Sequence, residues 1–140
     1  MQQFFDFLPA PLDGLGFIAN YTFSDAKDSA GFDLVATSRN SYNLIGLYEK
    51  GPFSARVAYN YRDRAVFEFT EGRPSYIGAR SQLDVQFGLD VTKDIAIQFQ
   101  AQNLIPTDSA TVEFSGNDPV ALNSYAFAER RFILGIRAKF

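Results

Sequence analysis

Apolar and polar residues alternate along much of this chain with a period of two, as they do in β-strands whose two faces meet different surroundings. From Leu15 to Phe23, for example, every second residue is apolar or aromatic. The run 41–49 is less regular, because Ile45 and Leu47 fall on the otherwise polar face. The alternation predicts six strands, over residues 14–24, 41–49, 53–64, 82–91, 95–102 and 131–140.

The length of these runs favours a membrane β-barrel. They are about 9–12 residues long, whereas strands of soluble proteins usually have about 5–6 residues. A strand that crosses a bilayer at a tilt needs about 9–11 residues. Long strands also occur in soluble proteins, so the alternative is a soluble β-sandwich, in which the apolar faces form the core and the polar faces the surface.

Two short connectors predict hairpins with matching apolar faces. Pairing across Lys50-Gly51 sets Tyr48 opposite Phe53 and Leu44 opposite Val57. Pairing across residues 92–94 sets Phe87 opposite Phe99, and Leu89 opposite Ile97. In both hairpins the apolar residues then share one side of the sheet.

The remaining connectors are long and polar, over residues 25–38, 65–79 and 105–128. Short turns at one end of a sheet and long loops at the other are typical of outer-membrane barrels, with the long loops outside the cell. The sequence therefore predicts an all-β fold, an antiparallel up-and-down meander of about six long strands that forms a section of a transmembrane β-barrel.

Six strands are too few to close such a barrel, because the smallest has about eight. We expect the segment Phe4–Leu8 to supply part of a seventh strand. An open sheet in lipid would leave backbone groups unpaired. We therefore interpret residues 1–140 as one C-terminal barrel segment whose N-terminal part is missing, consistent with a start, Met1-Gln2-Gln3, that lacks the features of a signal peptide.

Composition supports this interpretation and excludes several functions. The apolar fraction is 46%, yet the mean hydropathy is only −0.12, as expected where apolar residues alternate with polar ones. The formal net charge is −3. The chain has no Cys and no His, so disulfides, thiol nucleophiles, His-based triads and His metal sites are excluded. We expect no cofactor, and the negative charge gives no reason to expect nucleic acid as a partner.

The polar faces suit a hydrated lumen. We predict that they direct a set of charged side chains into the lumen. The alternative is that the arginines are only solvated or paired with the aspartates. The predicted lumen-facing residues are Arg56, Arg62, Asp84, Asp90 and Arg137. The apolar faces carry tyrosines that fit the membrane interface, where amphipathic rings are favoured, namely Tyr21, Tyr42, Tyr48, Tyr59 and Tyr61.

Several stretches resemble the C-terminal barrel strands of TonB-dependent outer-membrane receptors. Residues 12–23 resemble a strand near the end of these receptors, and residues 48–62 resemble a hairpin common there. Gln102-Asn103-Leu104 resembles a late Asn-Leu segment of the family, although Ile105-Pro106 follows it here. The terminal aromatic strand resembles the signal that the outer-membrane insertion machinery reads, with Gly135, Ala138 and Phe140 in the usual places and Ile133 at a position that is often polar.

This resemblance implies energised uptake of a siderophore, a carbohydrate or a similar bulky nutrient across the outer membrane of a Gram-negative bacterium. It implies lipid and the insertion machinery as partners, and contact with TonB only through a plug and an N-terminal box that this sequence does not contain. The segment by itself is then not competent for transport. Ligand contacts are expected from the loops, with Arg73, Tyr76, Asn117 and Asp118 as candidates.

Other functions find less support in the sequence. Asp84 and Asp90 lie about 20 Å apart along one strand, too far for a catalytic carboxylate pair. Asp25, Asp28 and Asp33 lack the spacing of a calcium loop. We therefore do not expect an enzyme, and the alternative to a receptor wall is a soluble or secreted β-sheet binding module.

Overall fold

The computed structural model describes residues 2–4, 9–29, 31–107, 109–115 and 118–139. Within them the chain forms strands and one three-residue 3₁₀ helix, and no helix there is long and apolar enough to cross a bilayer. The elements are β1 (Gln2–Phe4), η1 (Leu12–Gly14), β2 (Leu15–Phe23), β3 (Asn40–Lys50), β4 (Phe53–Arg62), β5 (Ala65–Thr70), β6 (Arg73–Ile77), β7 (Arg80–Asp90), β8 (Ile95–Gln102), β9 (Ser109–Ser115), β10 (Asp118–Ala126) and β11 (Arg131–Ala138).

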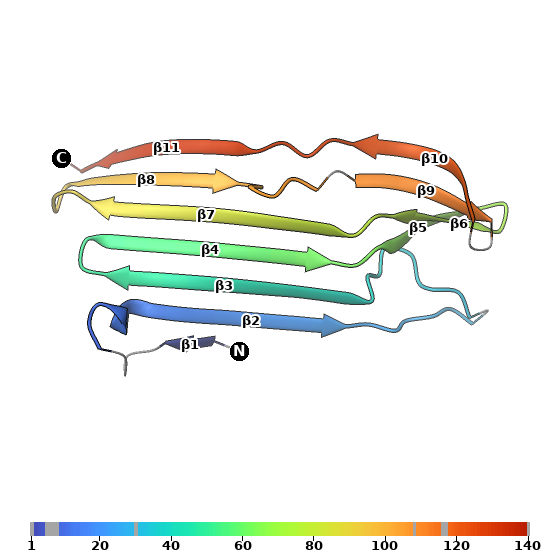
Figure 1. The fold of residues 1–140 in the computed structure, drawn as a ribbon, viewed down its shortest axis with the longest axis horizontal. Helices are drawn as coiled ribbons and strands as arrows, with labels where there is room; N and C mark the ends of the chain where they lie inside the picture. The colour runs from blue at the N-terminus through green and yellow to red at the C-terminus, as the bar shows by residue number, and fades with distance from the viewer. Residues whose placement is uncertain (1, 5–8, 30, 108, 116–117, 140) are drawn as a thin grey trace.

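The strands form two antiparallel sheets that together make a meander (Figure 1). The long strands build a seven-stranded sheet in the order β1-β2-β3-β4-β7-β8-β11. A four-stranded sheet, β10-β9-β6-β5, extends beyond the ends of these strands, where the hairpin β5–β6 pairs with the hairpin β9–β10 through β6 and β9. The predicted all-β antiparallel meander is therefore confirmed, and the sheet is not closed.

The prediction of long polar connectors was wrong for two of the three. Residues 65–79 and 105–128 contain the four strands of the second sheet. Each of these strands pairs with its hairpin partner, and the two hairpins are joined by the pairing of β6 with β9. Because β6 and β9 lie more than thirty residues apart in sequence, local periodicity gives no sign of their pairing.

The register of the first hairpin also differs from the prediction. Lys50 pairs with Phe53 across a Gly51-Pro52 turn, and Tyr48 pairs with Ala55. The shift of two residues leaves every side chain on its predicted face, because the period of a strand is two. The second hairpin is paired as predicted, with Phe87 opposite Phe99.

The predicted seventh strand is present but begins earlier than expected. Gln2, Gln3 and Phe4 form β1 and pair with β2 in antiparallel register. The rest of the predicted segment, residues 5–8, lies outside the described residues.

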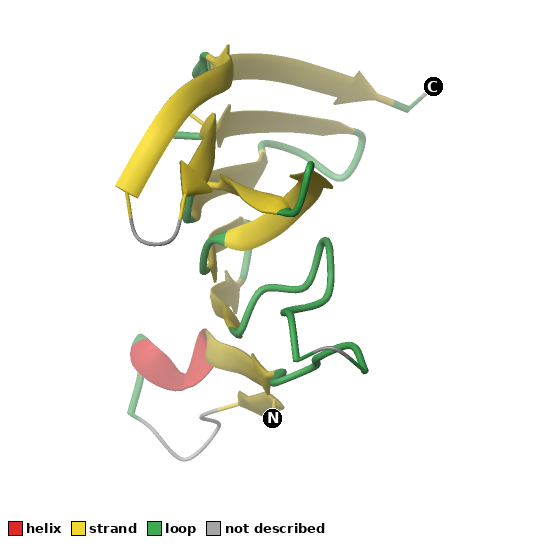
Figure 2. Cartoon of the chain, turned by 90° about the vertical axis from the view of Figure 1, so that its right-hand side faces the viewer, coloured by secondary structure: helices red, strands yellow, loops and turns green. Residues whose placement is uncertain are grey.

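The long strands form one layer (Figure 2). This layer buries few side chains. Apart from the contact of η1 with β3, all extensive contacts between elements are between hydrogen-bonded neighbours. In the described part of the chain only Ala58, Ala65, Val66, Ala96 and Ala101 are buried apolar residues. Both faces of the seven-stranded sheet are therefore open. Among the described residues, no second sheet covers either face, as one would in a β-sandwich.

Candidate functional site

One face of the seven-stranded sheet is apolar across six neighbouring strands. The register aligns the alternating residues of these strands into rows that cross the whole sheet. The central row runs through Phe17, Gly46, Val57, Val85, Ala101 and Phe132, and the next row through Leu15, Tyr48, Ala55, Phe87, Phe99 and Leu134. These rows form only if the register of all five strand pairs places apolar residues on the same side. The apolar face is therefore a property of the whole sheet.

Large side chains on this apolar face are exposed. Phe87 retains 48% of its accessible surface and Val57 retains 41%, although both lie on inner strands. On the edge strand β11, Leu134 and Ile136 retain 70% and 72%. Contiguous apolar surface of this extent marks a contact with lipid or with another protein. In water it would be unfavourable by about 25 cal/mol per Å² of apolar area left uncovered.

Tyrosines border the apolar face at its loop end. Tyr21, Tyr42 and Tyr61 form one cross-strand row, and the rings of Tyr42 and Tyr61 stack with centroids 4.9 Å apart. Tyr21 Oη donates to Asn40 Oδ1 at 2.7 Å, and Tyr61 Oη donates to Asp63 Oδ1 at 2.9 Å. Each of these two side chains thus combines an apolar ring with a bonded polar tip, the arrangement that suits a membrane interface.

Asp63 completes this polar border just beyond the end of β4. Asn40 Nδ2 donates to Asp63 Oδ2 at 2.5 Å. The hydrogen bonds from Asn40 and then from Tyr61 hold the pKa of the Asp63 carboxyl below its ordinary value of 3.8. The loop end of the apolar face therefore carries an anchored carboxylate.

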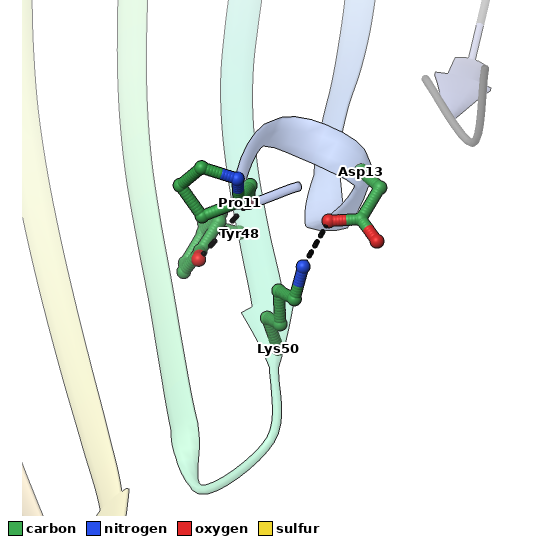
Figure 3. Close-up of polar contacts among 4 residues, drawn as sticks. All are labelled: Pro11, Asp13, Tyr48 and Lys50. Atoms are coloured by element: carbon green, nitrogen blue, oxygen red, sulfur yellow. Dashed lines mark hydrogen bonds and ion pairs between the residues drawn. The ribbon is translucent and has the colours of Figure 1, made fainter. Parts of the chain in front are cut away.

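The turn end has a second polar border (Figure 3). Tyr48 Oη donates to the carbonyl oxygen of Pro11 at 3.2 Å, and Lys50 forms an ion pair with Asp13. The ammonium group of Lys50 lowers the pKa of the Asp13 carboxyl. Tyr42 and Tyr48 lie six residues apart on β3, about 20 Å along a strand. That spacing is of the order of the apolar band of a membrane barrel, about 25 Å.

The opposite face is polar. By register, all five of the residues predicted to face a lumen share it: Arg56, Arg62, Asp84, Asp90 and Arg137. Within the described residues none of these arginines forms an ion pair with either aspartate. Asp84 instead accepts hydrogen bonds from Gln82 Nε2, at 3.0 and 2.9 Å, and from the backbone N–H of Asn103 at 2.8 Å. Whether this face encloses a lumen stays a prediction.

A groove of about 460 Å³ lies on the polar face near its loop end. Arg62 and Arg80 line it as a directly opposed pair on β4 and β7. A row of amides lies beside them, formed by Asn20, Asn43, Asn60 and Gln82. Sequence reasoning did not single out Arg80 or these amides, because only the register between strands brings them together.

Asn103, part of the Asn-Leu segment, connects three elements at the end of β8. Its φ of 57° places it in the left-handed region, which Asn tolerates better than most residues. Its Nδ2 donates to the carbonyl oxygen of Glu129 at 2.9 Å, and the next N–H, of Leu104, donates to Leu83 at 2.8 Å. Its Oδ1 is buried and has no hydrogen-bond partner in the described part of the chain. The segment thus ties β8 to β7 and to the start of β11.

Three of the four predicted ligand residues lie on strands rather than in irregular loops, and whether they contact a ligand stays a prediction. Arg73 and Tyr76 belong to β6, and Asp118 begins β10. Tyr76 lines a cleft of about 710 Å³ between the segment 24–39 and the base of the second sheet, with the Arg64 guanidinium 4.8 Å from its ring centre. The structure does not bring Arg73 or Asp118 into this cleft, and Asn117 lies outside the described residues.

The residues of the predicted assembly signal end the last strand. Gly135 pairs with Gln98, and Ala138 pairs with Ile95. Ile133 lies on the polar face and keeps 41% of its surface exposed. Phe140 lies outside the described residues.

Comparison with known proteins adds no assignment. No protein-family model, curated protein or solved structure matches the chain. Among the described residues, no group of three or more acidic side chains is placed to hold a metal ion.

Proposed function

We propose that the long strands form part of the wall of a transmembrane β-barrel in the outer membrane of a Gram-negative bacterium, of the kind found in TonB-dependent receptors. The observation that carries this proposal is the uncovered apolar face, which is continuous across six strands and lies opposite a polar face. A barrel wall has this construction, with lipid on one side and water on the other.

The open edges of the sheet are consistent with such a wall. The outer edge of β11 has no strand beside it among the described residues. Unpaired backbone groups are costly in hydrocarbon, so in a membrane this edge requires further strands. We infer that the sheet is one section of a barrel whose remaining strands pair with it there.

The narrower assignment, to a receptor for energised nutrient uptake, rests on the resemblance of residues 12–23 and 48–62 and of the segment Gln102-Asn103-Leu104. Asn103 bonds to Asp84 on β7 and to Glu129, just before β11, which supports a structural role for that segment in the proposed wall. In such a receptor the chain would form part of the barrel wall. Solute binding and channel gating would also involve a plug and TonB. Siderophores and carbohydrates are the solute classes that this resemblance suggests.

A pair of tryptophan variants tests the orientation of the sheet. The chain has no native Trp, so a single introduced indole reports its own surroundings. Val57 and Arg56 are neighbours on β4 that lie on opposite faces. After refolding into lipid vesicles, we expect brominated acyl chains to quench the fluorescence of Val57→Trp strongly and that of Arg56→Trp weakly, because bromine quenches on contact.

Two results would contradict the proposal. Equal quenching of both variants would show that the sheet does not separate lipid from water. A folded, monodisperse monomer in buffer without detergent would favour the alternative, a soluble binding module. Circular dichroism of each sample establishes that the sheet is folded before quenching is compared.

A further inference from the structure

Arg62 and Arg80 are a directly opposed pair of like charges on the polar face. Directly opposed cross-strand pairs of like charge destabilise a sheet. Neither guanidinium has an ion-pair partner among the described residues. The ten residues that line their groove include no Asp and no Glu. The groove thus holds two positive charges and lacks an anion.

Positive charge also extends past this groove. Arg80 lines a second groove of about 490 Å³ in which Arg130 and Arg131 also lie, with Glu129 as the acidic residue there. The two grooves share Arg80 and Gln82. A planar guanidinium binds a carboxylate through two parallel hydrogen bonds, which makes an arginine pair well suited to this group.

The amide row beside the arginines offers hydrogen-bonding groups of a different kind. Asn43 Nδ2 donates to Asn60 Oδ1, which fixes the orientation of these two amides. Each amide has two N–H donors and an oxygen with two lone pairs, so this single bond leaves capacity on both side chains. Gln82 uses its Nε2 on Asp84. Adjacent donors and acceptors of this kind match the hydroxyl groups of a polyhydroxylated solute.

We propose that this groove binds a small polyhydroxy acid of monosaccharide size, with its carboxylate between Arg62 and Arg80 and its hydroxyls on the amide row. The volume of about 460 Å³ lies within the range of small-molecule sites. The inference goes beyond the proposed function, because it names the solute chemistry of the polar face. It depends on the register of β2, β3, β4 and β7 and not on lipid at the other face.

The test measures binding of three probes to the full chain refolded in detergent micelles, by calorimetry or by changes in amide NMR signals. D-Glucuronate carries both groups, D-glucose only hydroxyls, and acetate only the carboxylate. We expect glucuronate to bind most tightly. Arg62→Gln or Arg80→Gln should weaken glucuronate binding by about tenfold or more, because each removes charge-assisted hydrogen bonds. The matched control Arg56→Gln, on the same face but outside the groove, should change it less than about twofold.

Several results would overturn the proposal. These are equal affinity for glucose and glucuronate, an equal loss of binding in Arg56→Gln, or no glucuronate binding by a chain whose circular dichroism shows the sheet. An acidic peptide that binds more tightly than glucuronate would assign the groove to a protein segment instead. Bromine quenching of the Val57→Trp variant is measured separately, so failure of this site and failure of the membrane proposal remain distinguishable.

The stability of the arginine variants supplies a second measurement. Because the pair repels itself, Arg80→Gln should keep the sheet and be at least as stable as the wild type without ligand. Glucuronate should raise the unfolding midpoint of the wild type more than that of the variant. Loss of the sheet in Arg80→Gln would contradict the premise that this charge lacks a partner.

Discussion

At the scale of single residues, Asp63 determines how the loop end of the sheet responds to acid. Its carboxylate accepts hydrogen bonds from Asn40 and Tyr61, and both bonds favour the ionised form. A carboxyl whose pKa is lower in the folded state stabilises that state above its ordinary pKa, and this contribution is lost as the pH falls through the folded pKa. The contacts of Asn40 and Tyr61 with Asp63 therefore weaken as the pH falls through this lowered pKa.

We predict a midpoint below 3.8 for titration of the Asp63 carboxyl in the folded chain, measured by carbon NMR of labelled aspartate. Asn40→Ala and Tyr61→Phe should each raise this midpoint toward the ordinary value of 3.8, and Asn40→Ala should raise it more, because the bond from Asn40 is the larger cause. A wild-type midpoint at or above 3.8 would contradict the hydrogen-bonded arrangement. Asp63→Asn removes the signal and identifies it.

At the scale of elements, the β5–β6 hairpin depends on its turn. Glu71 and Gly72 have φ of 50° and 80°, so both central residues are in the left-handed region, as in the turns that match the twist of a hairpin. This backbone is readily adopted by glycine and is strained for alanine. The turn positions β6 for its pairing with β9, on which the second sheet depends.

We predict that Gly72→Ala destabilises the β5–β6 hairpin by about 1 kcal/mol. Hydrogen exchange should show faster opening of the β5 and β6 amides and unchanged protection in β3. Gly46→Ala is the matched control, because Gly46 has no positive φ and a Cβ there would have no heavy atom within 4 Å. If both variants exchange alike in β5 and β6, the turn does not have this conformation.

Hairpins also show which parts of the fold the sequence could predict. Periodicity located the six long strands and assigned their faces, because burial or lipid contact on one side imposes a period of two at each strand. It did not determine the β3–β4 register, where Gly51-Pro52 rather than Lys50-Gly51 forms the turn. It also did not find the pairing of Arg62 with Arg80, because no short turn sets the register of β4 with β7 and because β7 begins at Arg80, two residues before the predicted strand.

At the scale of the whole molecule, the sheet has a defined position relative to a bilayer if its apolar face contacts lipid. The central row, which contains Val57, lies between the tyrosine levels at the two ends of the strands. A lysine at the midplane of a membrane barrel costs about 2–4 kcal/mol, and one near the interface about 0–1 kcal/mol. The cost of a charge should therefore depend on its depth along the strands.

We predict that Val57→Lys lowers the free energy of unfolding in lipid vesicles by about 2–4 kcal/mol, and that Tyr21→Lys lowers it by about 1 kcal/mol or less. Urea titration followed by circular dichroism measures both. Gln98→Lys places the same charge on the polar face opposite Gly88 and Gly135 and should have little effect, because the proposed wall has water on that face. A cost for Val57→Lys no larger than that for Gln98→Lys would mean that the apolar face does not contact hydrocarbon. A large cost for Tyr21→Lys would instead place the tyrosine row at the midplane and contradict its position at the interface.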